Sequence, residues 1–195
     1  PIAAEAGVTT RFTALTKNTG QINATRAGLL SDATGTISVT EGTLAKVRIV
    51  EGSSGDGTRF TGRNVSTDGS FTLHAAGYDA NNNYLGDFAV NWIAADGRGV
   101  FSRTFDTSTV FDPQTPGVER IRADHASAQD DSTNTFTIST GVAKRVKVLA
   151  GVSGPGTETQ DVPLTTGEIF DFHASSFDAD NNRITDVSVT WRLSS

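Results

Sequence analysis

The sequence contains no cysteine and no methionine. The absence of cysteine excludes disulfide bonds, thiolate ligands for zinc and cysteine nucleophiles. Because the chain begins at Pro1 and has no methionine anywhere, we expect a processed product or an excerpt of a longer chain. The avoidance of cysteine, together with abundant threonine, serine, asparagine and glycine, is typical of exported bacterial or archaeal surface proteins. We therefore expect an extracellular or cell-surface location.

Long hydrophobic runs and an excess of positive charge are also missing. No apolar run approaches the roughly 20 residues that a membrane-spanning helix needs. The 16 Lys and Arg residues are outnumbered by 22 Asp and Glu residues, which gives a formal net charge of -6. A mildly acidic chain without a basic cluster is a poor ligand for nucleic acid or an anionic membrane. We expect neither of these partners and no membrane span.

The sequence does contain an internal duplication. Residues 77–92 read GYDANNNYLGDFAVNW, and residues 176–191 read SFDADNNRITDVSVTW, 99 residues later. The same spacing holds without a gap along the whole chain, and 27 of the 96 aligned pairs are identical. A repeat at a fixed spacing defines the structural unit. The chain is therefore two copies of one unit of about 100 residues, the size of a small domain.

Alternation of apolar and polar residues within each copy predicts β-strands. Phe71, Leu73 and Ala75 alternate with polar neighbours, as do Val90 and Trp92. This period of two, with Gly, Asn and Asp between the runs, predicts an all-β fold of half-buried strands. The expected core residues are the apolar members of both copies: Phe71, Leu73, Val90, Trp92, Phe170, Phe172, Val189 and Trp191.

Several stretches together resemble a known family. The succession of TISVTEGTLAKVRIVEG, AAGYDANNN and FAVNW is similar to bacterial immunoglobulin-like (Big-type) repeats, which occur in tandem on adhesins, surface-layer proteins and some phage structural proteins. The resemblance implies tandem immunoglobulin-like β-sandwiches with a 99-residue repeat. Trp92 and Trp191 would then take the place of the core tryptophan on the middle strand.

The same resemblance implies where along the sequence each module begins and ends. A family module opens with a strand like LAKVRI and closes with one like TFTIST, which makes residues 43–141 a complete immunoglobulin-like module. Residues 1–42 would be the closing strands of one module, and residues 142–195 the opening strands of another. Two or three strands alone are marginally stable and expose an apolar face.

Three arrangements would complete the two half-modules. The chain is an excerpt in which neighbouring modules supply the missing halves, or each copy folds alone as 1–99 and 100–195 with permuted strands. In the third arrangement, the C-terminal half of one subunit completes the N-terminal half of the next. Such a head-to-tail contact does not close on itself and produces a fibre.

Acidic and amide side chains alternate in the duplicated stretch and offer oxygen ligands. Calcium takes six to eight oxygens, so these residues are candidate calcium ligands. The same residues also suit a tight hairpin turn, because Asn and Asp tolerate left-handed backbone angles and bond their own main chain. The candidates are Asp79, Asn81, Asn83 and Asp87, with Asp178, Asp180, Asn182 and Asp186 in the second copy.

No arrangement of residues in the sequence suggests catalysis, so we expect no enzyme, no catalytic residues and no cofactor other than calcium. His74 and His173 are equivalent in the two copies and are expected on a solvent-facing or inter-module face. Asn23 and Asn64 lie in N-glycosylation sequons.

The function predicted from the sequence is that of a structural repeat protein in a fibre, stalk or surface array, whose partners are copies of itself or neighbouring modules. One alternative is an adhesin module that binds a glycan or a host-surface protein through its loops. Another is a phage tail or capsid decoration.

Overall fold

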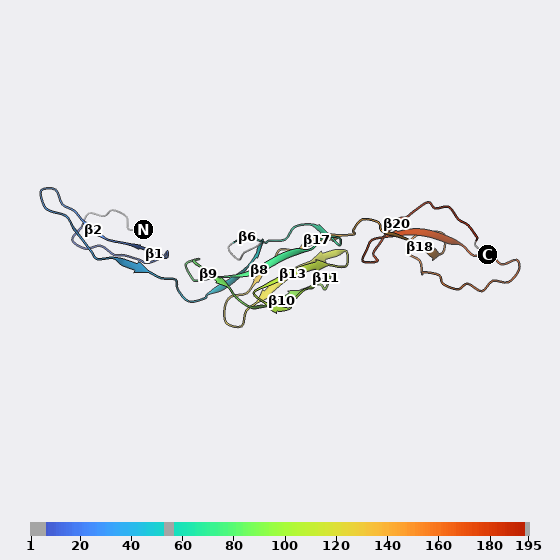
Figure 1. Ribbon diagram of the computed structural model, residues 1–195, viewed down its shortest axis with the longest axis horizontal. Helices are drawn as coiled ribbons and strands as arrows, with labels where there is room; N and C mark the ends of the chain where they lie inside the picture. The colour runs from blue at the N-terminus through green and yellow to red at the C-terminus, as the bar shows by residue number, and fades with distance from the viewer. Residues whose placement is uncertain (1–6, 53–56, 194–195) are drawn as a thin grey trace.

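The computed structural model describes residues 7–52 and 57–193, and these residues form strands and loops without a helix. The predicted all-β fold is therefore confirmed. Figure 1 shows an elongated chain in which residues 43–141, the central segment, lie between two smaller end segments. We call residues 7–42 the N-terminal segment and residues 142–193 the C-terminal segment.

The end segments contain few strands. The N-terminal segment has four: β1 (Asn18–Gly20), β2 (Asn23–Ala24), β3 (Asp32–Ala33) and β4 (Ile37–Val39). The C-terminal segment has three: β18 (Arg145–Ala150), β19 (Phe172–Phe177) and β20 (Arg183–Asp186).

The central segment contains the other strands. Those in its first half are β5 (Lys46–Glu51), β6 (Thr58–Arg59), β7 (Val65–Ser66), β8 (Phe71–Tyr78), β9 (Tyr84–Asp87) and β10 (Val90–Ala94). Those in its second half are β11 (Gly99–Phe101), β12 (Phe105–Asp106), β13 (Ser108–Pro113), β14 (Gly117–Glu119), β15 (Ile121–Asp124), β16 (Asp131–Ser132) and β17 (Phe136–Ser139).

The strands of the central segment make three sheets around one core. The largest has the order β11-β13-β8-β5-β6, with β9 beside β8. The others have the orders β12-β10-β15-β16 and β14-β17-β7, and the β17–β7 pair is parallel. One face of each of the long strands β5, β8 and β13 is buried, which follows from the alternation in the sequence. The buried residues of all three sheets form a single cluster.

Aromatic rings occupy much of this core. The ring centroids of Phe71 and Phe111 are 5.6 Å apart, and those of Phe101 and Phe111 are 5.1 Å apart. Such tilted contacts add stabilisation beyond the buried area. Trp92 lies 6.2 Å from Phe101, and its indole Nε1–H donates a hydrogen bond of 3.0 Å to the Asp106 carbonyl oxygen. The one polar atom of this side chain is thereby satisfied inside the core.

The duplication is reproduced in the strand registers. In the central segment β5 pairs with β8 from Lys46↔Tyr78 onward, and β18 pairs with β19 from Arg145↔Phe177 onward, each residue shifted by 99. The β14–β17 pairs recur in β1–β4, and the β15–β16 pairs recur in β2–β3, with the same shift. These ladders of the end segments therefore repeat ladders of the corresponding halves of the central segment.

We predict that Trp92→Ala destabilises the central segment by about 3 to 5 kcal/mol, because it empties a large buried volume and removes the indole hydrogen bond. Urea unfolding followed by far-ultraviolet circular dichroism measures this loss. Ile93→Ala, on the exposed side of the same strand, is the matched control and changes the free energy of unfolding by less than about 0.5 kcal/mol. Equal effects of the two substitutions would contradict this description of the core.

Candidate interaction faces at the two ends of the chain

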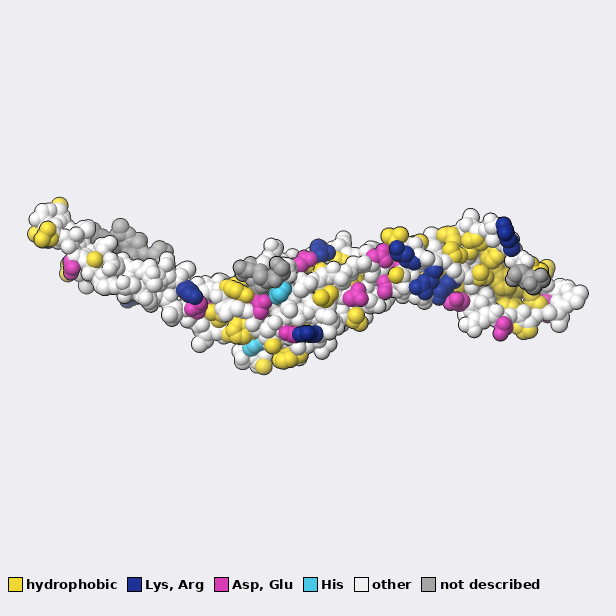
Figure 2. Space-filling view, in the orientation of Figure 1, with side chains coloured by type: hydrophobic (Ala, Val, Ile, Leu, Met, Phe, Trp, Pro, Cys, Tyr) yellow, Lys and Arg dark blue, Asp and Glu magenta, His cyan; other side chains and the backbone are white. Residues whose placement is uncertain are grey.

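The C-terminal segment leaves the apolar side of its sheet open. Trp191 is 54% exposed, whereas Trp92, at the same position of the first copy, is 3% exposed. Val146 is 55% exposed, and its counterpart Val47 is 2% exposed. Figure 2 shows apolar side chains gathered over this end of the molecule. The same sequence pattern is thus buried in one copy and open to solvent in the other.

The residues expected in the core divide in the same way. Those of the first copy are buried: Phe71, Leu73, Val90 and Trp92. Those of the second copy are exposed: Phe170, Phe172, Val189 and Trp191. The physical reason is that no second sheet lies over the strands β18–β20 within the described chain, so that their apolar side faces solvent.

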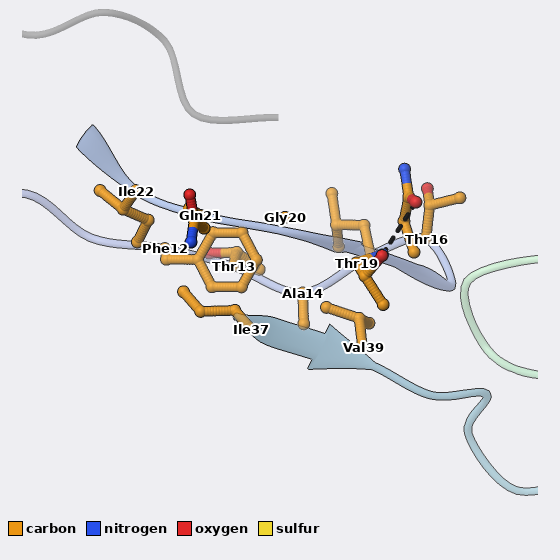
Figure 3. Close-up of a pocket in the computed structure, with 12 residues that line it drawn as sticks. Phe12, Thr13, Ala14, Thr16, Thr19, Gly20, Gln21, Ile22, Ile37 and Val39 are labelled. Atoms are coloured by element: carbon orange, nitrogen blue, oxygen red, sulfur yellow. Dashed lines mark hydrogen bonds between the residues drawn. The ribbon is translucent and has the colours of Figure 1, made fainter. Parts of the chain in front are cut away.

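The N-terminal segment has a complementary open face. Phe12 is 40% exposed, although its counterpart Phe111 is completely buried. A hollow of about 320 Å³ is lined by Phe12, Ile22, Ile37 and Val39, among others. Figure 3 shows the Phe12 ring beside Ile22 and Ile37, and Val39 lies farther along β4, the strand that contains Ile37. The counterparts of these four residues all belong to the core of the central segment.

Four ladders of the central segment join its first half to its second: β8–β13, β10–β12, β10–β15 and β7–β17. The described parts of the end segments lack all four, because each end segment has only one of the two partners. Three stretches that would take part in these ladders are accordingly not strands in the end segments. They are residues 9–14, 164–165 and 189–193. These stretches are thus unpaired because their partner strands belong to the other half of the repeat.

The two open faces lie at opposite ends of the chain. The central segment separates them along the long axis of the molecule (Figure 1). The open faces of one chain therefore do not cover each other in this structure.

A buried aspartate connects the central segment to the N-terminal segment. Asp79 Oδ2 accepts a hydrogen bond of 3.0 Å from the backbone N–H of Gly42, in the connection between β4 and β5. Both Asp79 oxygens also accept from Asn83, one from its backbone N–H and one from its side-chain amide. The Asn83 amide donates a further bond of 3.0 Å to the Leu15 carbonyl oxygen. We call this group the first junction.

The second junction repeats the first between the central and C-terminal segments. Asp178 Oδ2 accepts 3.0 Å hydrogen bonds from the Gly141 backbone N–H and from the side-chain amide of Asn182. The same amide donates a bond of 2.9 Å to the Gln114 carbonyl oxygen. Asp178 also accepts from the Thr67 hydroxyl at 2.7 Å. This role is not predicted from the sequence, although both glycines and both aspartates are identical in the two copies.

These hydrogen bonds keep the two aspartates ionised. For Asp79, the side-chain amide of Asn83 and the backbone N–H of Gly42 lower the pKa to about 2. For Asp178, burial raises the pKa, but hydrogen bonds from Asn182, Thr67 and Gly141 outweigh it and the pKa is lowered to about 2. Carboxylates that accept several N–H bonds behave in this way.

The structure places six of the candidate calcium ligands in two hairpin turns, whereas Asp87 and Asp186 end the strands β9 and β20. Asn82 and Asn181 have positive φ angles of 66° and 70°, as a tight turn requires. Asn81 donates its backbone N–H to Asp79, and Asp87 lies 2.9 Å from the His74 ring. The turn geometry thus accounts for the candidates within the two turns.

In the second hairpin, the pKa of Asp186 is lowered by hydrogen bonds from the Ser175 hydroxyl, the Gly154 backbone N–H and the Arg183 guanidinium. The pKa of Asp180 is raised by burial and by nearby carboxylates. Over residues 7–52 and 57–193, no group of three or more His, Asp or Glu side chains is placed to hold a metal ion. Calcium binding by Asp79, Asn81, Asn83, Asp87 and their counterparts stays a prediction.

The histidines and the sequons occupy different environments. His74 is partly covered, and His173 is buried with its ring nitrogens 2.9 and 2.8 Å from the carbonyl oxygens of Gly151 and Gly154. The expectation that His173 faces solvent or another module is not met, because a loop covers the polar side of its strand. Asn23 and Asn64 are both exposed.

No model of a known protein family matches the chain, and a search of curated proteins found no similar sequence. Among the described residues there is no helix of the length and hydropathy needed to cross a membrane.

We predict that the junction aspartates titrate with pKa values of about 2, which carboxyl carbon chemical shifts measured by NMR against pH would show. Because the pKa in the folded chain lies below the ordinary value of 3.8, the stabilisation is fully present well above pH 3.8 and is lost as the pH falls through about 2. Asn83→Ala removes a donor and raises the pKa of Asp79.

The matched control for that substitution is Asn81→Ala, because Asn81 contributes only its backbone N–H. It should leave the pKa of Asp79 low. A pKa near 3.8 in the unsubstituted chain would show that the junction hydrogen bonds do not persist in solution.

Proposed function

We propose that this chain is a structural, non-catalytic repeat protein that works outside the cell in a fibre, stalk or surface array of immunoglobulin-like sandwiches. The observation that supports the proposal is the pair of open apolar faces at opposite ends of an elongated chain. Each face has the side chains of half a sandwich core, and each lacks the strands that would cover it.

The free energy of covering these faces favours extension of the array. Burying one large apolar side chain contributes about 1.5 to 3 kcal/mol. The C-terminal face alone exposes Trp191, Phe172, Phe170 and Val189. Contact between two different faces at opposite ends is heterologous, and it adds units in a line when the geometry does not close a ring. The expected product is a linear assembly.

The two junctions support a mechanical role. Each connects consecutive segments through a buried aspartate that accepts hydrogen bonds from a glycine of one segment and an asparagine of the other. Because these equivalent bonds, and the bond from each asparagine to the preceding segment, have nearly the same lengths, consecutive segments are held by one repeated contact. A repeated contact of this kind suits a protein whose work is to maintain length.

We predict that Trp191→Ala weakens self-association at least tenfold, since about 1.4 kcal/mol of lost burial is sufficient for that factor. Sedimentation velocity across a concentration series measures the effect. Val142→Ala is the matched control, because Val142 is 67% exposed and its counterpart Thr43 is also exposed, outside the core of the central segment. A chain that is monomeric at high concentration would contradict the proposed function.

A further inference from the structure

We propose that the C-terminal segment of one copy and the N-terminal segment of a second copy form a composite sandwich, with the strand register of the central segment. The occupant of each open face is thus the opposite face of another copy of this chain. This inference rests on the proposed function and adds the strands, the register and the residue pairs.

The central segment is the template for the register. Within each end segment the existing ladders already have the central pairs shifted by 99 residues. The missing ladders are then determined. β8–β13 pairs Phe71 with Phe111, so Phe170 of one copy lies opposite Phe12 of the next. The ladders β10–β15 and β7–β17 add the pairs Trp191–Ala24, Leu193–Ile22, Val39–Leu164 and Thr40–Thr165.

The side-chain volumes of the composite core are compatible with this register. The central core contains Leu73 and Phe136, whose counterparts are Phe172 and Ile37. The larger residue of this pair has therefore moved from one half to the other, which leaves the combined volume of the two side chains unchanged. Volume-conserving exchanges of this kind are the ones that cores tolerate best. The N-terminal hollow, about 320 Å³ in volume, offers space for such rings. Elsewhere the composite core is smaller, since Thr159 is the counterpart of Phe60.

Hydrogen-bonding groups are also available in the composite sandwich. In the central segment the Asp131 carboxylate accepts a bond of 2.9 Å from the backbone N–H of Ile49. The counterparts are Asp32, which is identical, and Val148. The Trp92 indole donates to the Asp106 carbonyl, and the equivalent acceptor for Trp191 is the Gly7 carbonyl.

The charges add a feature that the central segment lacks. Val110 and Thr72 are cross-strand partners there, and their counterparts are Arg11 and Asp171. Both charged side chains are exposed, and neither forms an ion pair within the described parts of one chain. Opposite charges directly across an antiparallel ladder favour the pairing. This pair would favour association between copies in the proposed register.

One position departs from the template. Arg59 pairs with Asp131 in the central segment, whereas the counterparts Glu158 and Asp32 are both acidic. Lys147 lies 2.8 Å from Glu158 and brings a positive charge to this site. The contact between copies would therefore use a different cation from the one used within the central segment.

Two single-cysteine chains test the register, because the natural chain has no cysteine. Arg11→Cys and Asp171→Cys chains are mixed under mild oxidation, and the disulfide-linked heterodimer is measured by mass spectrometry. The counterpart pair faces outward in the central segment, so both thiols should be accessible. The control mixture contains Arg11→Cys and Ile169→Cys chains. Ile169 lies two residues before Asp171 and is 91% exposed. We expect about tenfold faster linkage in the matched mixture, because disulfides need closely spaced β-carbons.

The outcomes separate the register from the function. Association of the chains without faster linkage of the matched pair overturns the register and leaves the proposed function standing. Linkage of either variant with itself, faster than in the mixture, overturns the head-to-tail arrangement. Chains that do not associate at all overturn both proposals.

A charge exchange provides a second measurement on the unlinked chain. Arg11→Asp alone, or Asp171→Arg alone, should weaken association by about twofold to fivefold. A chain with both substitutions restores opposite charges across the contact and should recover the original affinity. Additive weakening in the doubly substituted chain would overturn the pairing of these two residues.

Discussion

A β-sheet with one apolar face is stable in water only when a second layer covers that face, and this constraint governs the whole chain. The central segment satisfies it, because strands β5–β10 and strands β11–β17 contribute to one closed core. Each end segment holds half of the same set of strands and so leaves its apolar residues exposed. The missing ladders and the unpaired stretches all follow from the one missing layer.

The junctions add a second constraint, which is on the path of the chain. A closed core would tolerate many angles between consecutive segments. The buried Asp79 and Asp178 restrict them, because each carboxylate bonds a glycine of the connection and an asparagine that also reaches the preceding segment. In the assembly that we propose, covered faces supply the cohesion between units and the junctions supply the direction.

Local sequence predicted the strands well, since alternation of Phe71, Leu73 and Ala75 depends only on which side of a strand each residue faces. It predicted the hairpins for a similar reason, because Asn82 and Asn181 tolerate the left-handed conformation that the turns need. Whether a face is covered is not a local property. Trp92 and Trp191 lie in similar sequences, yet only Trp92 has strands on both sides, β12 and β15.

Other features depended on contacts between distant residues. The bond from Thr67 to Asp178 joins positions 111 residues apart, and no spacing in the sequence predicts it. The burial of His173 likewise comes from the loop that contains Gly151 and Gly154. The identity of Gly42 with Gly141, and of Asp79 with Asp178, was visible in the repeat, but its reason emerges only from the hydrogen bonds.

The central claim, that the open faces are covered when chains assemble, is tested most directly by quenching the fluorescence of the two tryptophans with a soluble quencher. In dilute solution we expect two populations, an accessible Trp191 and a protected Trp92. As the chain concentration rises and assemblies form, the accessible population should disappear. An assembly in which Trp191 remains as accessible as in the monomer would contradict the account.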